Sequence, residues 1–490
     1  MPTLWAEFVG VFKFKRADTF KHLLDRTRDV PVTIVPESST GVLVWAVENL
    51  DRVGALDCPE VFNANAFGTL WAPPFVDKEL PHLRDLRFAI SPGGGCYRAI
   101  PGTVPLRAHS LLSLSLAHAH VPFYTPRLTR LSLLGAYFDP PTNTGRTVDE
   151  LLDALQHCLL LEHIDITYAI SMGRSTTWGL HRRCRLPRLT QLAVIRTHLD
   201  AVHLLFEALE APELRSVRLQ LAAEDRVVDI LNLPELRRVL SLPEHYILCI
   251  RCKSGVQYPS GKDFELVLGA LEHLRTAFSY DYLHQDTMYD DRDGFRFSLD
   301  QQGDPHTDPV DVRPLSIEST TSILEDVSSN IRCVGLSLST VFLSGPADDW
   351  VQRMRPILRA CLNVVTVEVV IDFDNHFSVV RALLNPRDSE FIFPRLHTLN
   401  LKLVRKLGLR RGDHVAGSAP DWMAWKDNGV HLRVFIEERA AAGCPLDDVC
   451  VVCEDESEEG AENTRAFRSD IHGFVGHLLS AESQSNTEEA

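Results

Sequence analysis

The phrase Pro-x-Leu-x-x-Φ-x-Φ, in which Φ is apolar, stands at both ends of residues 186–221. Its two copies begin at Pro187 and Pro212, so the phrase returns after 25 residues. Each copy closes on alternating apolar residues, which is typical of a short strand with one buried face. Between the copies, residues 198–210 carry apolar side chains at helical spacing. A strand phrase that returns after roughly 20–29 residues across a helix predicts a leucine-rich solenoid.

The same phrase recurs along much of the chain. Its first apolar position falls at Leu83, Leu111, Leu128, Leu161, Leu189, Leu214 and Leu236, and later at Ile331, Leu362, Leu396 and Leu446. We predict a strand after each of these positions, and a helix that begins near Thr147. The expected fold is therefore α/β: an irregular, horseshoe-like leucine-rich-repeat solenoid with a parallel concave sheet and outer helices.

The phrase is hard to see between residues 240 and 330. There the patterns predict a strand at 246–252, a helix at 264–274 and a hairpin at 289–299. Long insertions rich in Gly, Asp or Pro are expected at 91–105, 285–311 and 405–427.

The chain is expected to divide into three parts. Residues 1–50 form an N-terminal cap, residues 51–453 the solenoid, and residues 454–490 an acidic linker with a disordered end. A short helix at 464–480 fits the apolar stripe in that last part.

Composition narrows the classes of function. The chain has 490 residues, too many for one globular core, whereas a repeat array grows without a thick core. Its net charge of -16 disfavours a nucleic-acid partner, because phosphate binding needs clustered Lys and Arg. No apolar run of about 18 residues and no signal sequence is present. With scattered cysteines, these features favour a cytoplasmic or nuclear protein without a membrane partner.

Patterns of catalytic and metal sites fail on their spacing. The two Cys-x-x-Cys pairs, Cys249 with Cys252 and Cys450 with Cys453, lie about 200 residues apart, far more than the 15–20 typical of paired zinc half-sites. Core cysteines in strands are the favoured interpretation. Asp263 stands where a phosphate loop needs Ser or Thr. We therefore expect no metal, no cofactor and no enzymatic activity.

The strand phrase also predicts a candidate binding face. If its apolar positions point into the core, the residues between them lie on the opposite face, which is the usual partner surface of a solenoid. The predicted contacts with a protein partner are Arg87, Ser115, Ser132, Asp165, Ala193, Arg218, Gln220, Asn400 and Lys402. Any parallel solenoid has one solvated face, so the insertions and the acidic tail stay open as alternatives.

The N-terminus carries a family resemblance. Pro2-Thr3-Leu4-Trp5, a helix with Phe20 and Leu24 on one face, and Val30-Pro31-Val32-Thr33-Ile34 follow one another in that order. This order resembles the segment after the F-box in mushroom-type fungal F-box proteins with leucine-rich repeats. In that family the F-box binds a Skp-type adaptor of a cullin-type ubiquitin ligase, and the solenoid binds the substrate.

The resemblance implies that this chain is the substrate-receptor part of such a ligase. Its mechanism would be proximity, since holding a substrate near a charged ubiquitin-conjugating enzyme raises the effective concentration. The F-box would lie before Met1, so the chain by itself is expected not to bind the adaptor. A stand-alone solenoid scaffold with no ubiquitin role is the alternative, and an enzyme with a site near 285–311 is a third hypothesis.

Overall fold

The computed structural model forms two compact units, unit 1 (Met1–Leu221) and unit 2 (Ala222–Ala490). The boundary between them falls inside residues 51–453, which the sequence presents as one array. The structure describes residues 2–9, 17–34, 45–46, 49–62, 79–90, 106–117, 123–135, 146–167, 170–171, 183–197, 199–222, 233–242, 247–254, 262–269, 295–300, 328–338, 355, 358–372, 380–381, 384, 391–404, 422–453, 469 and 473–474.

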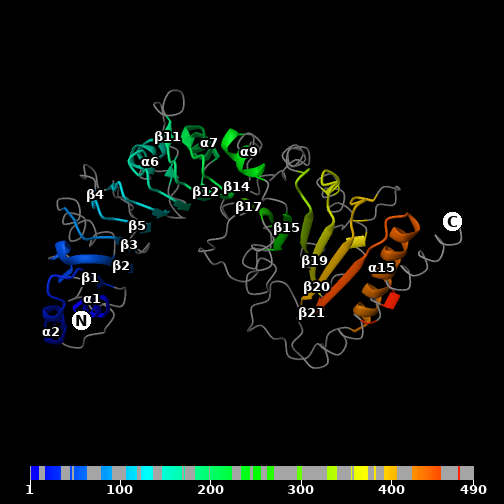
Figure 1. The fold of residues 1–490 in the computed structure, drawn as a ribbon, viewed down its shortest axis with the longest axis horizontal. Coiled ribbons are helices and arrows are strands. Elements are labelled where there is room, and N and C mark those ends of the chain that lie inside the picture. The colour runs from blue at the N-terminus through cyan, green and yellow to red at the C-terminus, as the bar shows by residue number, and fades with distance from the viewer. Residues whose placement is uncertain are drawn as a thin grey trace, which may run out of the picture. The chain divides into compact units, whose positions relative to one another are not determined.

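Unit 1 contains a sheet of parallel strands that pair in chain order, and Figure 1 shows them following one another from the N-terminus. The eight strands are β1 (Val32–Ile34), β2 (Val53–Phe62), β3 (Asp85–Ile90), β5 (Ser113–Ala117), β7 (Arg130–Leu134), β9 (His163–Thr167), β12 (Gln191–Thr197) and β14 (Ser216–Ala222). The prediction of an α/β fold with a large parallel sheet is confirmed, as are six strands that the repeated phrase predicts, β3 to β14.

The same turn precedes most of these strands. The N–H of the first apolar residue donates to the carbonyl three residues earlier, as Leu128 does to Thr125 (3.1 Å) and Leu189 to Leu186 (3.2 Å). The carbonyl of the next residue then accepts two successive N–H groups from the following turn, as Thr129 does from Glu162 (2.8 Å) and His163 (3.0 Å). These bonds satisfy the backbone where it enters the sheet, so each turn fixes the register of the next.

Two helices accompany the later strands of this sheet. In α6 (Val148–Leu155) the buried residues Val148, Leu151, Leu152 and Leu155 recur at helical spacing. The following helix, α7 (Leu199–Ala208), lies beside α6 and joins β12 to β14. Within the sheet Leu192 pairs with Val217, a return of 25 residues. The strand, helix and strand predicted for residues 186–221 are confirmed.

Short strands form three separate two-stranded sheets outside the main sheet. The pairs are β4 (Leu106–Arg107) with β6 (Phe123–Tyr124), β8 (Arg146–Thr147) with β10 (Ile170–Ser171), and β11 (Cys184–Arg185) with β13 (Leu209–Glu210). All three pairs are parallel and join neighbouring segments of the chain.

Two helices precede the first strand: α1 (Pro2–Phe8) and α2 (Ala17–Thr27), which confirms the predicted N-terminal helix. At the end of α2, Arg28 adopts the left-handed conformation (φ 52°). Arg52, in the short 3-10 helix Leu50–Arg52, donates from Nη2 to Thr27 Oγ1 (3.0 Å) and to the Arg28 carbonyl. This contact ties the helix end to the start of β2.

The sheet of unit 2 is mixed. In spatial order its strands are β17 (Phe295–Asp300), β16 (Lys262–Gly269), β15 (Ile247–Ser254), β18 (Cys333–Leu338), β19 (Thr366–Asp372), β20 (Thr398–Val404) and β21 (Asp448–Cys453). β17, β16 and β15 pair antiparallel, whereas β15, β18, β19, β20 and β21 pair parallel. The strands predicted after Ile331, Leu396 and Leu446 are confirmed, and so is the strand at 246–252.

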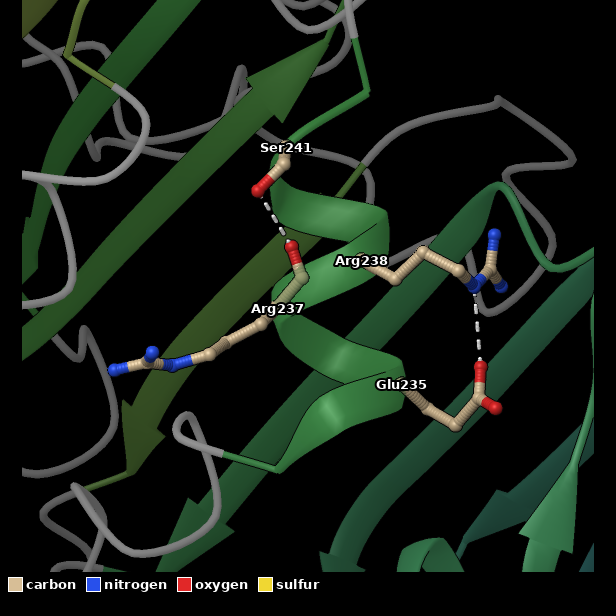
Figure 2. A network of polar contacts seen from close by, with 4 residues as sticks. All are labelled: Glu235, Arg237, Arg238 and Ser241. Atoms are coloured by element: carbon tan, nitrogen blue, oxygen red, sulfur yellow. Dashed lines mark hydrogen bonds and ion pairs between the residues drawn. The ribbon is translucent and has the colours of Figure 1, made fainter.

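The strand predicted after Leu236 is wrong, because this segment forms helix α9 (Pro234–Leu240). Leu236, Val239 and Leu240 are buried at helical spacing, and Pro234 occupies the first turn, where its missing N–H costs nothing. Figure 2 shows Arg238 reaching back to Glu235 (Nε to Oε2, 3.2 Å), while Ser241 Oγ donates to the Arg237 carbonyl (2.8 Å). These contacts stabilise a helix of only two turns.

The helix predicted at 264–274 is also wrong where the structure describes it, because residues 264–269 belong to strand β16. Residues 264–269 pair with β15, and residues 264–268 also pair with β17, so backbone pairing on both sides holds this segment extended. Of the predicted hairpin, residues 289–294 lie outside the described part. Strand β17, inside the expected insertion 285–311, pairs with β16.

The register of strand β19 differs from the one predicted by the phrase that begins at Leu362. The phrase beginning at Leu362 fits the sequence, but Leu362 is 59% exposed and Val364 is fully buried. The same phrase also fits two residues later, as Val364, Val367 and Val369, and the pairing of Val367 with Leu399 selects that reading. Sequence spacing alone does not separate two overlapping copies.

Helix α15 (Trp422–Ala441) overlaps the insertion expected at 405–427, and the rest of that insertion lies outside the described residues. Its buried stripe holds Leu432, Phe435, Ile436 and Arg439. Arg439 Nη2 donates to the carbonyls of Phe393 (3.0 Å) and Leu396 (3.4 Å) in the turn before β20. The stripe escapes sequence analysis because one of its buried members is an arginine.

Other predicted segments, including the insertion at 91–105 and nearly all of 454–490, lie outside the described residues. Within the part that the structure describes, none of the helices combines the length and the apolar composition that crossing a bilayer requires.

Candidate functional site

The predicted contacts of unit 1, except Gln220, fall in one row across the sheet. Direct pairing in register joins Asp57, Arg87, Ser115, Ser132, Asp165, Ala193 and Arg218, one residue from each strand from β2 to β14. Each member lies between two core positions of its strand, so its side chain points away from the core. We call these seven residues the central row. Adjacent members are about 4.8 Å apart along the sheet, which makes the row a continuous surface.

An ion pair marks the β2 end of the row. Arg87 Nε lies 3.9 Å from Asp57 Oδ1, and the side chains are 50% and 37% exposed. At that length the contact is electrostatic rather than a hydrogen bond. Burial raises the pKa of Asp57, and the positive charge of Arg87 lowers it in part. The pair is open enough to exchange its partner for a charge on another molecule.

Asp165 is the carboxylate at the centre of the row. Its Oδ1 accepts a hydrogen bond from Thr167 Oγ1 (3.1 Å) two residues later on the same face. Burial raises the pKa of Asp165, while this hydrogen bond and the positive charge of Arg218 lower it. The carboxylate is thus held in one orientation and kept partly out of water, at a cost in solvation.

The surroundings of Asp165 are polar and small. Ser132 lies directly beside it on β7, and His163 lies two residues earlier on the same face. Within the described residues, His163 Nδ1 is buried and has no hydrogen-bond partner. Ala193 separates Asp165 from Arg218 and leaves space between them. The centre of the row therefore offers both donors and acceptors to a molecule laid across it.

The remaining predicted contacts are not in this row. Gln220 pairs with Ile195, two residues beyond the pair of Arg218 and Ala193. The side chain of Gln220 lies outside the described part. In unit 2, Asn400 lies between Glu368 and Cys450 on neighbouring strands, and Asn400 Nδ2 donates to Glu368 Oε1 (3.5 Å). Lys402 lies two residues after Asn400, and its side chain is also outside the described part.

Two polar residues of these rows are absent from the sequence prediction. Asp57 was missed because the strand signal around residues 44–61 is weak, although Leu56 and Cys58 flank it as core positions would. Glu368 was missed because the phrase beginning at Leu362 sets the wrong register for β19. The later copy of the phrase would have identified Glu368 as an intervening residue.

The cysteine pairs lie in strands, as predicted: Cys249 and Cys252 in β15, and Cys450 and Cys453 in β21. Cys450 is only half-buried, since it points to the same face as Asn400. Among the residues that the structure describes, no three His, Cys, Asp or Glu side chains come close enough together to hold a metal ion.

Comparison with known proteins adds no family to this description. Neither family models, nor curated proteins, nor solved structures match the chain. The geometry of the row is therefore the basis for a functional proposal.

Proposed function

We propose that the chain is an irregular leucine-rich-repeat solenoid that recognises a protein partner, and that the central row of unit 1 is its contact surface. The observation that carries the proposal is the register, because seven strands each place one residue in a single line. A line of mixed charge and small side chains suits a protein surface better than a small molecule, which needs a concave and mostly apolar pocket.

The electrostatics of Asp165 support this choice. Burial disfavours its charged form, and perturbed carboxylates of this kind gather at functional sites more often than elsewhere. A partner that donates a hydrogen bond to the Asp165 carboxylate, or places a positive charge beside it, compensates for the hydration that this carboxylate loses on folding. Arg87 and Arg218 lie on either side and supply the opposite charge, which favours one orientation of the partner.

Within this proposal, the chain is the substrate-receptor part of a cullin-type ubiquitin ligase in the cytoplasm or nucleus. The support is the resemblance of the N-terminus to the F-box/leucine-rich-repeat family: the phrase Pro2-Thr3-Leu4-Trp5, then helix α2, then the strand β1 after Pro31. The stand-alone scaffold is the second candidate, because the row serves binding equally well without ubiquitin transfer.

The experiment is proximity labelling by the whole chain in cells, compared with a variant blocked in the row. Ser132→Arg places a long charged side chain at the centre of the row, and Ser329→Arg in an exposed turn of unit 2 is the matched control. We expect Ser132→Arg to lose a defined set of labelled proteins that Ser329→Arg keeps. Identical sets for all three chains would overturn the proposed surface.

The half-life of the labelled partners separates the two candidates. A ligase receptor shortens the life of its substrate, so depletion of the chain should make the partner accumulate. Ser132→Arg should fail to restore degradation, whereas Ser329→Arg should restore it. Partners whose half-lives stay unchanged on depletion point to the scaffold.

A further inference from the structure

A second surface of unit 1 lies on the turns that precede the strands. On three successive turns it carries Arg107, His109, Tyr124, Arg127, His157 and Leu159, which we call the aromatic–basic patch. Five of these residues come from equivalent places in the turns, two or four residues before the first apolar position, and Arg127 lies one residue before it. All six are exposed, including Tyr124 (41%) and Leu159 (52%), which are among the large apolar side chains exposed in the described part of the chain.

Contacts in the structure hold the patch together. Arg107 pairs with Tyr124 across the β4–β6 ladder. The Tyr124 ring lies between two imidazoles, with centroid distances of 4.9 Å to His157 and 6.4 Å to His109, the latter edge to face. Three turns thus fix one aromatic side chain, which lowers the entropy that binding must remove.

The charge of the patch is opposite to that of the chain. The turns at 107–110, 124–127 and 157–160 contain no Asp or Glu, although the chain as a whole carries a net charge of -16. Acidic side chains border these turns: Glu79 beside Arg107, Asp153 four residues before His157, and Glu210 beyond, in an ion pair with Arg185 (3.5 Å). A positive region bounded in this way selects a short negative segment rather than a long one.

We propose that the aromatic–basic patch is a second docking surface, which binds an acidic peptide segment of a partner protein that carries an aromatic or leucine side chain. Carboxylates pair with Arg107 and Arg127, and the apolar side chain packs on Tyr124 and Leu159. A nucleic acid is the less suitable ligand, because these turns carry only two arginines and no lysine, and the acidic remainder of the chain repels an extended polyanion. The proposal does not rest on the central row.

The test measures the fluorescence anisotropy of a short labelled peptide that repeats Glu-Glu-Phe, titrated with the full chain. The double variant Arg107→Glu and Arg127→Glu reverses two charges and should raise the Kd about tenfold. Each substitution removes an attractive contact with a peptide carboxylate and creates a repulsive one. The matched control is the pair Arg332→Glu and Arg359→Glu, two exposed arginines of unit 2 with the same change in net charge. The control pair should leave the Kd unchanged.

The aromatic contribution has its own variants. Tyr124→Ala should raise the Kd about fivefold, and Tyr124→Phe should keep the affinity because the ring remains. Ser132→Arg in the central row should not change peptide binding, so this result is independent of the proposed function. Equal weakening by both arginine pairs, or no weakening by either, overturns the patch. Tighter binding of a single-stranded oligonucleotide than of the peptide, lost in the Arg107→Glu and Arg127→Glu pair, overturns the acidic-peptide assignment.

Discussion

Units 1 and 2 use the same entry turn but build different sheets from it. In both, the first apolar residue of a strand donates to the carbonyl three residues earlier, as Leu161 does in unit 1 (3.0 Å) and Ile331 in unit 2 (3.2 Å). Unit 1 repeats this turn along an all-parallel sheet. Unit 2 combines four parallel pairings with two antiparallel ones and adds the 20-residue helix α15.

The difference follows from what each pairing needs. A parallel strand needs a crossover before the next strand, so a parallel sheet imposes a returning phrase on the sequence. An antiparallel neighbour needs only an alternating run, which carries no period along the chain. Regularity in unit 1 also keeps the residues between core positions in register, and this produces the central row. The following changes test how separate and how different the two units are.

The largest effect is expected from truncating a core leucine in either unit. Leu192 in β12 and Leu399 in β20 are both buried, at 2% and 0% exposure, and occupy the same place in the phrase. Each change to Ala should cost about 3 kcal/mol, because it removes buried methyl groups and leaves a cavity. Hydrogen exchange should lose protection only in the unit that carries the change. Equal loss in both units would show one cooperative body.

Buried thiols provide a probe for each unit. Burial raises the pKa of Cys158 in unit 1 to about 11 and that of Cys333 in unit 2 to about 12. At pH 8 the Cys158 thiolate should therefore be about 100-fold rarer than that of an unperturbed thiol, and alkylation correspondingly slower. A timed iodoacetamide pulse read by mass spectrometry should modify the half-buried Cys450 before Cys158 and Cys333. Labelling of Cys158 or Cys333 at the rate of Cys450 contradicts their burial.

Unit 2 has a buried arginine, Arg439, whereas the described residues of unit 1 include no buried arginine. Arg439 is fully buried, and in the described residues its Nε and Nη1 lack hydrogen-bond partners, so burial lowers its pKa to about 10. Its carbon stem and ring packing stabilise unit 2, whereas its buried charge costs stability. Arg439→Ala should cost about 2 kcal/mol in urea unfolding, and Arg439→Met less than about 1 kcal/mol. A Met variant as unstable as the Ala variant would mean that the guanidinium bonds dominate.

The smallest effect is expected at Asp165. Burial raises its pKa in the folded chain, so the protonated form is favoured by folding, and this stability is lost as the pH rises through the folded pKa. The amide that replaces the carboxyl in the Asp165→Asn variant does not ionise, so this variant avoids the cost of burying a charge and should raise Tm by about 1 °C at pH 7. Near pH 3, where Asp165 is protonated, the variant and the natural chain should have the same Tm. The control Asp448→Asn, exposed in β21, should not change Tm. A lower Tm for Asp165→Asn at pH 7 contradicts the desolvation account.

The sequence predicts unit 1 better than unit 2 for a physical reason. Leu83 to Leu214 mark strands whose burial follows directly from the phrase, and the central row follows from the same spacing. In unit 2, β16 and α9 fail because a short apolar run fits both a strand and a helix, and only its neighbours decide. Helix α15 fails because Arg439 occupies a core position. The aromatic–basic patch depends on ring contacts between separate turns, which no local pattern encodes.

The central claim is that the row on unit 1 binds a protein partner, and its most direct measurement is affinity. A partner recovered by proximity labelling is purified and titrated by calorimetry against the natural chain, Ser132→Arg and Ser329→Arg. We predict that Ser132→Arg weakens binding at least about tenfold, a change of 1.4 kcal/mol, while Ser329→Arg binds as the natural chain does. Equal affinity for all three chains would contradict the row as the contact surface.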